Sequence, residues 1–316
     1  MTNLTDPMFH DDDAARAHLE KLRWPNGPTC PHCGTVVGIT RFQGKSTREG
    51  LHQCNACRGH FTVTVGTVME RSHIPLAKWV LGFHLMAASK KGMSSKQLSR
   101  MLDLTYKTAW FMSHRIREAM TDPNPAPLGG EGKIVEADEA YHGKSETPMP
   151  PSPHRHGRPY LKKGKKNEKR TIIALVERGG EVRVKHLQAR VTAHNVRDIL
   201  VRNVDRASRL HTDESNLYPK VGAEFTKHET VNHGAKEYAR GDVTTNSVEG
   251  FFGIFKRGLN GNYQHCSEQH FQRYLNEFAF RYNNRIKLGV DDTQRAAIAV
   301  HGAFGKRLTY RGPRSA

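Results

Sequence analysis

Two CxxC pairs near the start of the chain constrain its fold more than any other feature of the sequence. They are separated by 20 residues, and their thiols belong to Cys30, Cys33, Cys54 and Cys57. Four thiolates held by two tight turns complete the tetrahedral shell of a structural Zn²⁺ site. Disulfides, which need an oxidising compartment, and a redox pair, which needs only one CxxC, are the alternatives. Residues 1–70 are therefore predicted to be an N-terminal segment followed by a zinc ribbon of short strands.

The compartment is inferred from the beginning of the chain and from its apolar segments. The first residues, MTNLTDPMFHDDD, are acidic where a secretory signal is basic and then apolar. No run approaches the roughly 18 apolar residues that a membrane-spanning helix requires. We therefore expect a cytoplasmic protein with reduced thiols and no membrane partner.

The charge of the chain is unevenly distributed. The sequence has 49 Lys and Arg against 31 Asp and Glu, a net charge of +18. Residues 71–120 and 142–170 each contain nine basic and two acidic side chains, and they flank an acidic strip at 121–141. Basic blocks indicate a polyanionic partner, most often nucleic acid, although a solvated basic surface has the same composition. The acidic strip favours a divalent cation, because clustered carboxylates near bound phosphates need compensation.

Residues 71–125 have the periodicity of helices and are interpreted as a helix-turn-helix domain. Apolar residues recur at three- and four-residue spacing after Leu76, and Ser94 and Thr105 are suited to begin two further helices. A charged three-helix bundle without DNA-binding activity has the same pattern. In the DNA-binding interpretation, the last helix enters the major groove. Its expected DNA contacts are Lys107, Arg115 and Arg117.

The second basic block, residues 142–170, is predicted to be a flexible insertion. It contains PMPPSP followed by HRHGRPYLKKGKKNEKR, a composition too charged and proline-rich to bury a core. The insertion is either a clamp on DNA or a segment that only improves solubility. As a clamp, it would contact DNA through Lys162, Lys163, Lys165 and Lys166.

Residues 126–290 are predicted to form an RNase H-like domain. A strand at 133–141, a hairpin at 171–187, a helix near 192–204 and a strand ending near 213 follow one another in the order of that mixed sheet. The chain as a whole is thus an α+β or α/β multidomain protein, with the mixed sheet flanked by helices and residues 291–316 forming a C-terminal tail.

Three acidic residues of this domain are expected to form a catalytic metal site. The fold places its first and fourth strands side by side, so Asp138 and Asp213 meet although they are 75 residues apart. A helix at 246–259 supplies Glu249. Three carboxylates can hold two Mg²⁺ or Mn²⁺ ions, which stabilise the attacking and leaving oxygens of a phosphodiester. Two histidines, His211 and His233, are weaker candidates for contacts with a metal or a phosphate.

The sequence resembles the insertion-sequence transposases of bacteria that combine an N-terminal zinc ribbon with a DDE catalytic domain, the ISXO2-like group. The resemblance covers about residues 25–290 and rests on the two CxxC pairs, on Val231-Asn232-His233, on TTNSVEGFF from Thr244, on Lys256-Arg257-Gly258 and on YLNEFAFRYN from Tyr274.

The resemblance implies an activity and assigns residues to it. It implies an enzyme that binds the ends of its element, cuts them in a metal-dependent reaction and transfers the strand to target DNA by in-line attack. Asp138, Asp213 and Glu249 match the catalytic triad. Some relatives use an asparagine and a downstream lysine in place of the glutamate, so Asn246 and Lys256 are expected auxiliaries. Double-stranded DNA is the implied partner, bound by a homo-oligomer close to the nucleoid.

Two other functions agree with the same residues. One is a DNA-binding regulator derived from a transposase, with an inert catalytic domain. The other is an RNase H-like nuclease that hydrolyses DNA without joining it. The first needs no metal ions at the carboxylates, and the second yields no joined product.

Overall fold

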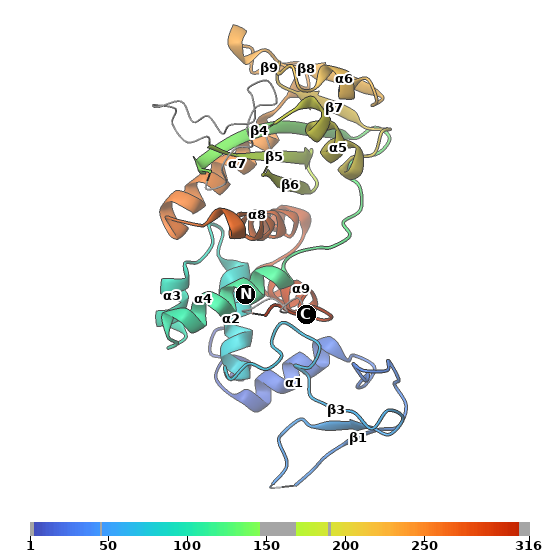
Figure 1. Ribbon diagram of the computed structural model, residues 1–316, viewed down its shortest axis with the longest axis vertical. Coiled ribbons are helices and arrows are strands. Elements are labelled where there is room, and N and C mark those ends of the chain that lie inside the picture. Colours follow the sequence, from blue (N-terminus) through green and yellow to red (C-terminus); the bar gives the residue numbers. More distant parts are fainter. Residues whose placement is uncertain (1–2, 45, 146–168, 189–190, 310–316) are drawn as a thin grey trace, which may run out of the picture. The chain divides into compact units, whose positions relative to one another are not determined.

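The computed structural model describes residues 3–44, 46–145, 169–188 and 191–309. The four lysines expected to act as a DNA clamp, at positions 162, 163, 165 and 166, lie outside the described residues. The chain divides into two compact units, Met1–Asp122 with Asn284–Ala316, and Pro123–Asn283 (Figure 1). The first unit is therefore built from both ends of the chain, and the second from its middle.

The ribbon segment of the first unit folds into three short antiparallel strands in the order β1-β2-β3, as the sequence predicts. Their bounds are β1 Ile39–Arg41, β2 His52–Cys54 and β3 His60–Phe61. The sequence analysis did not identify helix α1 (Asp12–Arg23) or the short 3-10 helix η1 (Pro7–Phe9) before the strands. Trp24 at the end of α1 packs edge-on against Phe61, which joins the helix to the ribbon.

The predicted helix-turn-helix is present in the first unit. It consists of α2 (Leu76–Ala88), α3 (Ser95–Met101) and α4 (Tyr106–Ala119). The side chain of Ser94 accepts a hydrogen bond from the backbone N–H of Gln97, and Thr105 does the same for Thr108. Such N-caps satisfy donors that the first turn of a helix leaves free, so both helices begin where the sequence indicates.

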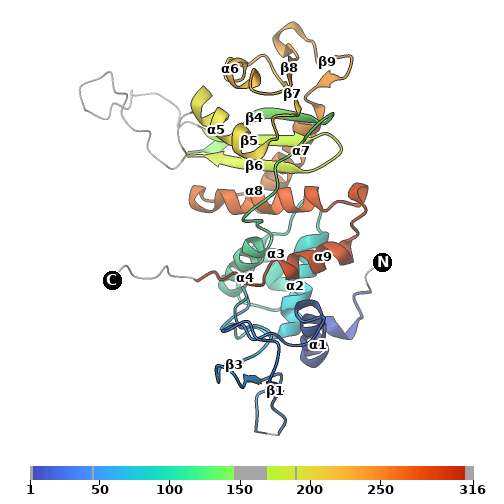
Figure 2. The same ribbon diagram turned by 90° about the vertical axis from the view of Figure 1, so that its right-hand side faces the viewer.

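The segment expected to be a C-terminal tail contributes a packed helix to the first unit. Helix α9 (Asp292–His301) begins with a capping box between Asp291 and Gln294. It packs against α2 and buries Ala299 and Val300 (Figure 2). The structure thus places this stretch within a folded unit, because a strong helix start is followed by an apolar face that needs a partner.

The second unit is built on a five-stranded mixed sheet in the order β6-β5-β4-β7-β8. The strands are β4 Ile134–Lys144, β5 Lys169–Glu177, β6 Val182–Leu187, β7 Arg209–Thr212 and β8 Lys227–Thr230. Strands β4, β5 and β6 pair antiparallel, whereas β7 is parallel to both β4 and β8. This is the RNase H-like arrangement that the sequence predicts.

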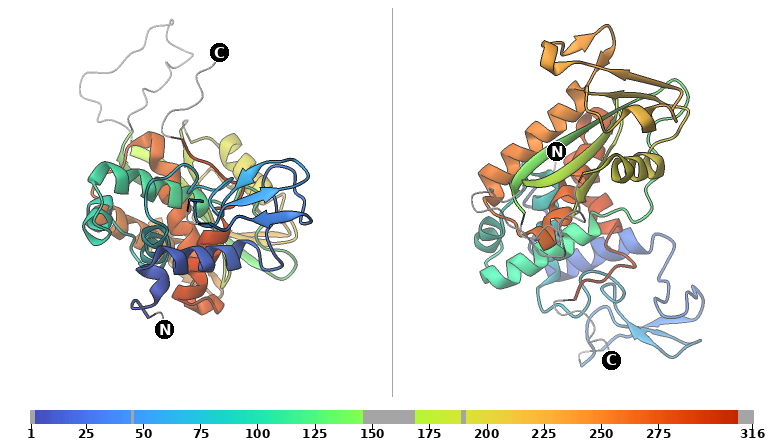
Figure 3. Two further views of the ribbon diagram at one scale, coloured as in Figure 1. Left: turned by 90° about the horizontal axis from the view of Figure 1, so that it is seen from below. Right: turned by 45° about the horizontal axis from the view of Figure 1, so that its top comes forward.

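Helices cover both faces of this sheet and create two apolar cores. On one face, α5 (Ala193–Asn203) and α6 (Pro219–Gly222) pack over Val135, Ala137 and their neighbours. On the other, α7 (Asn246–Gly258) and α8 (Glu268–Asn283) pack over Ala140 and the even-numbered residues of β5. The right-hand view of Figure 3 shows the sheet between α7 and α5.

The aromatic stripe of α8 lies in the second of these cores, as its helical spacing indicates. Phe271, Tyr274 and Phe278 are buried there against Phe255 of α7. The remaining short elements are η2 His233–Ala235, the hairpin β9 Ala239–Arg240 with β10 Val243–Thr244, the π-helical turn η3 Leu259–Tyr263 and η4 Ile286–Leu288. Within the described parts of the chain, every helix is too short or too polar to cross a bilayer.

Candidate active site and metal centre

The four cysteines of the ribbon converge on one point. Their four Sγ atoms all lie within 4.8 Å of one another. The Sγ atoms of Cys30 and Cys57 are 3.7 Å apart, and those of Cys33 and Cys54 are 3.6 Å apart. A tetrahedral zinc site with Zn–S bonds of about 2.3 Å has sulfur–sulfur edges of about 3.8 Å, whereas a disulfide is about 2.0 Å long. The geometry fits a zinc ion and rules out a disulfide.

Three carboxylates meet where strand β7 ends beside β4. Oxygen atoms of Asp138, Glu139 and Asp213 lie within 4.8 Å of one another. Strand β7 pairs with β4 only as far as Glu136, so β4 has no β7 neighbour at the next acidic positions. Side chains from both faces of β4 can therefore reach Asp213 around the open edge. The structure brings Asp138 and Asp213 together as expected and adds Glu139, which the alternation of the strand places on the opposite face.

The crowding of these acids changes their affinity for protons. Burial raises the pKa of Asp138 to about 6, and the nearby carboxylate of Asp213 acts in the same direction. Burial also raises the pKa of Glu139 to about 7, and Asp213 and Asp138 again favour its protonated form. The pKa of Asp213 is raised by burial as well. A divalent cation would replace these protons, so the site has the properties of an oxygen-ligand metal site.

Glu249, in the first turn of α7, lies outside the group of carboxylates whose oxygen atoms meet within 4.8 Å. Its charge contributes to the raised pKa of Asp138, so the two carboxylates are close enough to interact. One Glu249 oxygen accepts a hydrogen bond from Thr245 Oγ1 at 2.9 Å and lies 3.7 Å from His233 Nε2. The side chain is 44% exposed, which leaves it free to turn toward a bound cation. His233 thus belongs to the same neighbourhood, as the sequence suggested.

A buried glutamate fixes the start of α7 against the sheet. Glu136 is completely buried and accepts hydrogen bonds from the backbone N–H groups of Ser247 and Val248, at 2.7 and 3.2 Å. Its other oxygen accepts two from the guanidinium of Arg178, at 2.8 and 2.9 Å. A carboxylate is well suited to this place because free N–H groups at a helix start favour negative charge. Glu136 therefore positions the turn that carries Glu249, a role the sequence analysis missed.

The other predicted residues of this domain lie in different surroundings. Asn246 is exposed at the first position of α7, and Lys256 is exposed two turns later with its Nζ 5.9 Å from the centre of the Phe252 ring. His211 is fully buried, and its Nδ1 lies 3.3 Å from Arg178. Its Nε2 lies 3.6 Å from Glu229, so the ring is enclosed by Arg178 and Glu229, which favours a packing role.

The helix-turn-helix presents fewer basic groups than the sequence indicates. Lys107 is exposed near the start of α4, where a recognition helix contacts bases. Arg115 is half-buried and donates a hydrogen bond to the backbone oxygen of Glu70. Arg117 is completely buried and donates one to Ser113 Oγ at 3.0 Å, so it cannot contact DNA. Helical periodicity places it on the face of α4 that packs inward, and the exposed basic residues Lys96 and Arg100 of α3 were overlooked.

The fold and the site together define a class of protein. A mixed RNase H-like sheet carries acids at its first strand and just beyond its fourth, with a further carboxylate on the helix that crosses one face. This is the arrangement of enzymes that process nucleic acids with divalent cations.

Comparison with known families identifies the particular group. Residues 127–283 match the ISXO2-like transposase domain, and residues 10–60 match the transposase zinc-ribbon domain. The chain therefore belongs to the ISXO2-like insertion-sequence transposases, which are DDE enzymes. It is 28% identical over 279 residues to an uncharacterized protein in transposable element ISH50 of Halobacterium salinarum, covering 86% of this chain and 91% of that protein.

Solved structures with a related fold are distant. A pre-cleavage Mos1 transpososome has 13% sequence identity and a TM-score of 0.30, covering 66% of this chain and 71% of that one. A mariner Mos1 paired-end complex with Mg also has 13% identity, with a TM-score of 0.27, covering 69% and 76%.

Proposed function

We propose that this transposase binds double-stranded DNA at the terminal repeats of its element, cuts it there and joins the ends to target DNA. The observation that carries the proposal is the convergence of Asp138, Glu139 and Asp213, with Glu249 beside them. Nothing in the apolar packing of the domain requires three carboxylates to meet beside β4, and their mutual repulsion costs stability. A catalytic role accounts for that cost.

Asp138, Asp213 and Glu249 are the proposed ligands of two Mg²⁺ or Mn²⁺ ions. Bound there, the ions would activate the attacking oxygen and stabilise the leaving oxygen of a phosphodiester. Asp138 lies within β4 and Asp213 directly follows β7, whereas Glu249 stands on a helix turn anchored by Glu136. Glu139 points to the face of β4 opposite Asp138 and α7, so we assign it to shaping the site. Asn246 and Lys256 are proposed auxiliaries, Lys256 holding a phosphate next to the cut.

The first unit is proposed to bind DNA. In it, Zn²⁺ held by Cys30, Cys33, Cys54 and Cys57 would keep the ribbon folded. The contacts with DNA would come from Lys107 at the start of α4, with Lys96 and Arg100 of α3 next to it. We further propose that a homo-oligomer in the cytoplasm pairs the two element ends.

A strand-transfer assay tests the proposal. The protein is incubated with Mg²⁺, a labelled DNA end taken from the region flanking its gene, and a plasmid. The expected result is a nicked end and a labelled plasmid product for the wild type, and unchanged DNA binding with neither product for Asp138→Asn. Nicking without joining would indicate a nuclease, and binding without nicking would indicate an inert regulator.

A further inference from the structure

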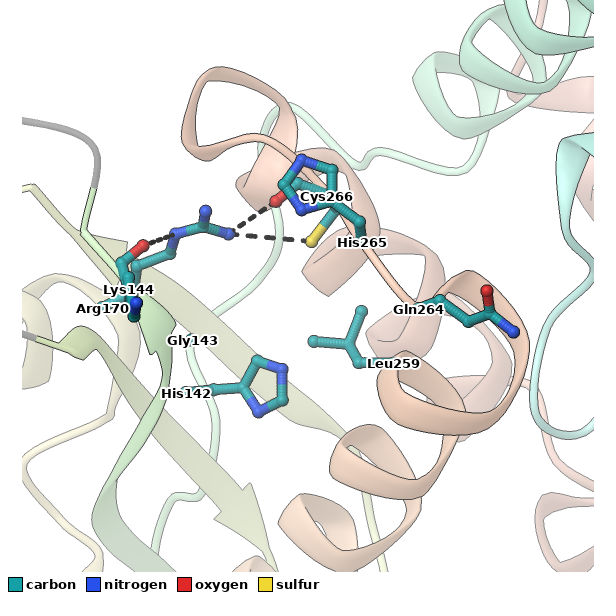
Figure 4. A pocket seen from close by; sticks show the side chains of 8 residues that line it. All are labelled: His142, Gly143, Lys144, Arg170, Leu259, Gln264, His265 and Cys266. Carbon is teal, nitrogen blue, oxygen red and sulfur yellow. Dashed lines mark hydrogen bonds between the residues drawn. The ribbon is translucent and has the colours of Figure 1, made fainter.

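A cavity at the far end of β4 is lined by cationic and polar side chains that the proposed reaction does not use. Its volume is about 270 Å³. Its walls come from the end of β4, the start of β5 and the turn between α7 and α8 (Figure 4). The residues that matter here are His142, Lys144, Arg170, Gln264, His265 and Cys266.

The wall of this cavity carries basic side chains on a lining that is more apolar than polar. Arg170 is buried; its guanidinium donates hydrogen bonds to the backbone oxygens of Lys144, at 2.9 Å, and Cys266, at 2.7 Å. Figure 4 shows it reaching from the sheet toward Cys266, with the ring of His142 pointing toward the opposite wall. Burial, and then the charges of Arg170 and Lys256, lower the pKa of His142, so this ring experiences a positive potential. An anion is the ligand that such a wall favours.

The cavity lies on the same face of β4 as the catalytic acids. Asp138 and His142 are four residues apart, so side-chain alternation puts them on one face about 13 Å apart. Helix α7 spans this interval: Glu249 lies in its first turn, and Phe255 near its end packs edge-on against His142. The exposed Lys256 follows Phe255. A DNA strand cut at the acids and running along α7 would reach the cavity within about four nucleotides of the cut.

We propose that this cavity receives a backbone phosphate of the bound DNA strand, held by Lys144 and Arg170. This inference rests on the proposed function, because it takes the cut strand as the occupant. The volume is slightly below the usual range of small-molecule sites, which suits a phosphate with part of its sugar. Lys144 is exposed and can contact DNA from the solvent side, whereas Arg170 is buried and supplies a fixed positive charge inside the cavity.

The test compares two lysines at the same end of the sheet. Lys144 lines the cavity, whereas Lys169 pairs with it across β4 and β5 and is exposed outside the lining. Binding of a fluorescent duplex carrying the element end is measured without divalent cations over a range of salt concentrations. Lys144→Ala is expected to weaken binding by about 3- to 10-fold and to reduce the salt slope by about one, and Lys169→Ala to change both less. The charge of Lys169 also reaches His142 from outside the lining, so the comparison rests on a clearly larger loss for Lys144→Ala than for Lys169→Ala, and equal losses would overturn the proposal.

Two further experiments identify which DNA phosphate is bound and test whether the cavity instead binds free phosphate. Duplexes with one neutral methylphosphonate are expected to show a position, within about four nucleotides of the cut, where wild-type affinity falls and Lys144→Ala affinity does not. Inorganic phosphate at constant ionic strength is the second probe. If it raises the melting temperature of the wild type but not of Lys144→Ala, while both bind DNA equally, the cavity takes a free anion and the proposal fails. These assays need no cleavage. If the protein binds DNA through the cavity but never joins DNA, the proposed function is refuted and the inference about the cavity stands.

Discussion

The ribbon cysteines and the sheet carboxylates are two ligand clusters with similar spacing between their atoms. They differ in how the chain brings these atoms together. Both gather their atoms within 4.8 Å. The cysteines come from two local turns, and their geometry is already that of a closed tetrahedron. The carboxylates come from distant strands, and burial and mutual repulsion raise the pKa values of Asp138 and Glu139.

The two clusters illustrate the difference between a structural metal site, which stabilises the fold around it, and a catalytic metal site, which an already folded domain provides. The ribbon has three short strands, so we expect its folding to depend on its ion. The RNase H-like sheet has apolar cores on both faces, so we expect it to fold without ions and to keep its acids together against their repulsion. The first cluster should therefore fail structurally when its metal is removed, and the second should fail only in function.

The largest expected effect is loss of zinc. Cys54→Ser removes a buried ligand, and zinc binding contributes on the order of 10 kcal/mol to the folding of such sites. We expect the variant to lose its zinc, measured by atomic emission, and the ribbon to unfold, measured by proteolysis. Cys266→Ser is the matched control, because Cys266 is a buried cysteine outside the cluster. A ribbon that stayed folded without zinc would break the comparison.

The second-largest effect concerns which glutamate, Glu249 or Glu139, is the third metal ligand. Glu249→Gln should reduce cleavage by on the order of 10³-fold, about 4 kcal/mol in the barrier, because a proposed ligand is removed. Glu139→Gln should cost about 10-fold or less, since we assign Glu139 to shaping the site and not to holding an ion. Cleavage rates at saturating Mg²⁺ measure both. The reverse order would make Glu139 the third ligand.

The anchor of α7 should matter to both stability and activity. Glu136→Gln removes the charge that accepts from Arg178 and from two backbone N–H groups, so we expect a loss of about 2–4 kcal/mol in unfolding free energy and much slower cleavage. Glu177→Gln is the control: Glu177 also accepts from a backbone N–H and from a lysine, but it is partly exposed. Urea unfolding should show a loss below about 1 kcal/mol there.

The smallest effect is a pH dependence of the metal-free protein. The pKa values of Asp138 and Glu139 are raised on folding, to about 6 and about 7, so the folded state binds more protons than the unfolded state. Their contribution is complete below about pH 4 and is lost as the pH rises to about 7. Mg²⁺ should reverse this loss, and Asp138→Asn should raise the metal-free stability at pH 7.5 by about 1–3 kcal/mol. If calorimetry showed no gain in stability for Asp138→Asn, repulsion among the three carboxylates would be contradicted.

Much of the architecture was predictable because its signals are local. The CxxC spacing, the caps at Ser94 and Thr105, and the apolar stripe of α8 each act within a few residues, and each is found where the sequence indicates it. The strand order of the sheet followed from the RNase H-like succession of strand, hairpin, helix and strand, a fold in which the first and fourth strands pair. The meeting of Asp138 with Asp213 then follows from that topology.

Only the tertiary structure decided which side chains share a site. Glu139 joins the acids because β7 ends early and opens an edge, and Glu136 anchors α7 through a contact 111 residues distant in sequence. Arg117 looks like a DNA contact in sequence but packs inside its bundle. Periodicity states which residues share a face of one element, but the burial of that face depends on where other elements end and dock. That information lies in long-range packing, beyond the reach of any local pattern.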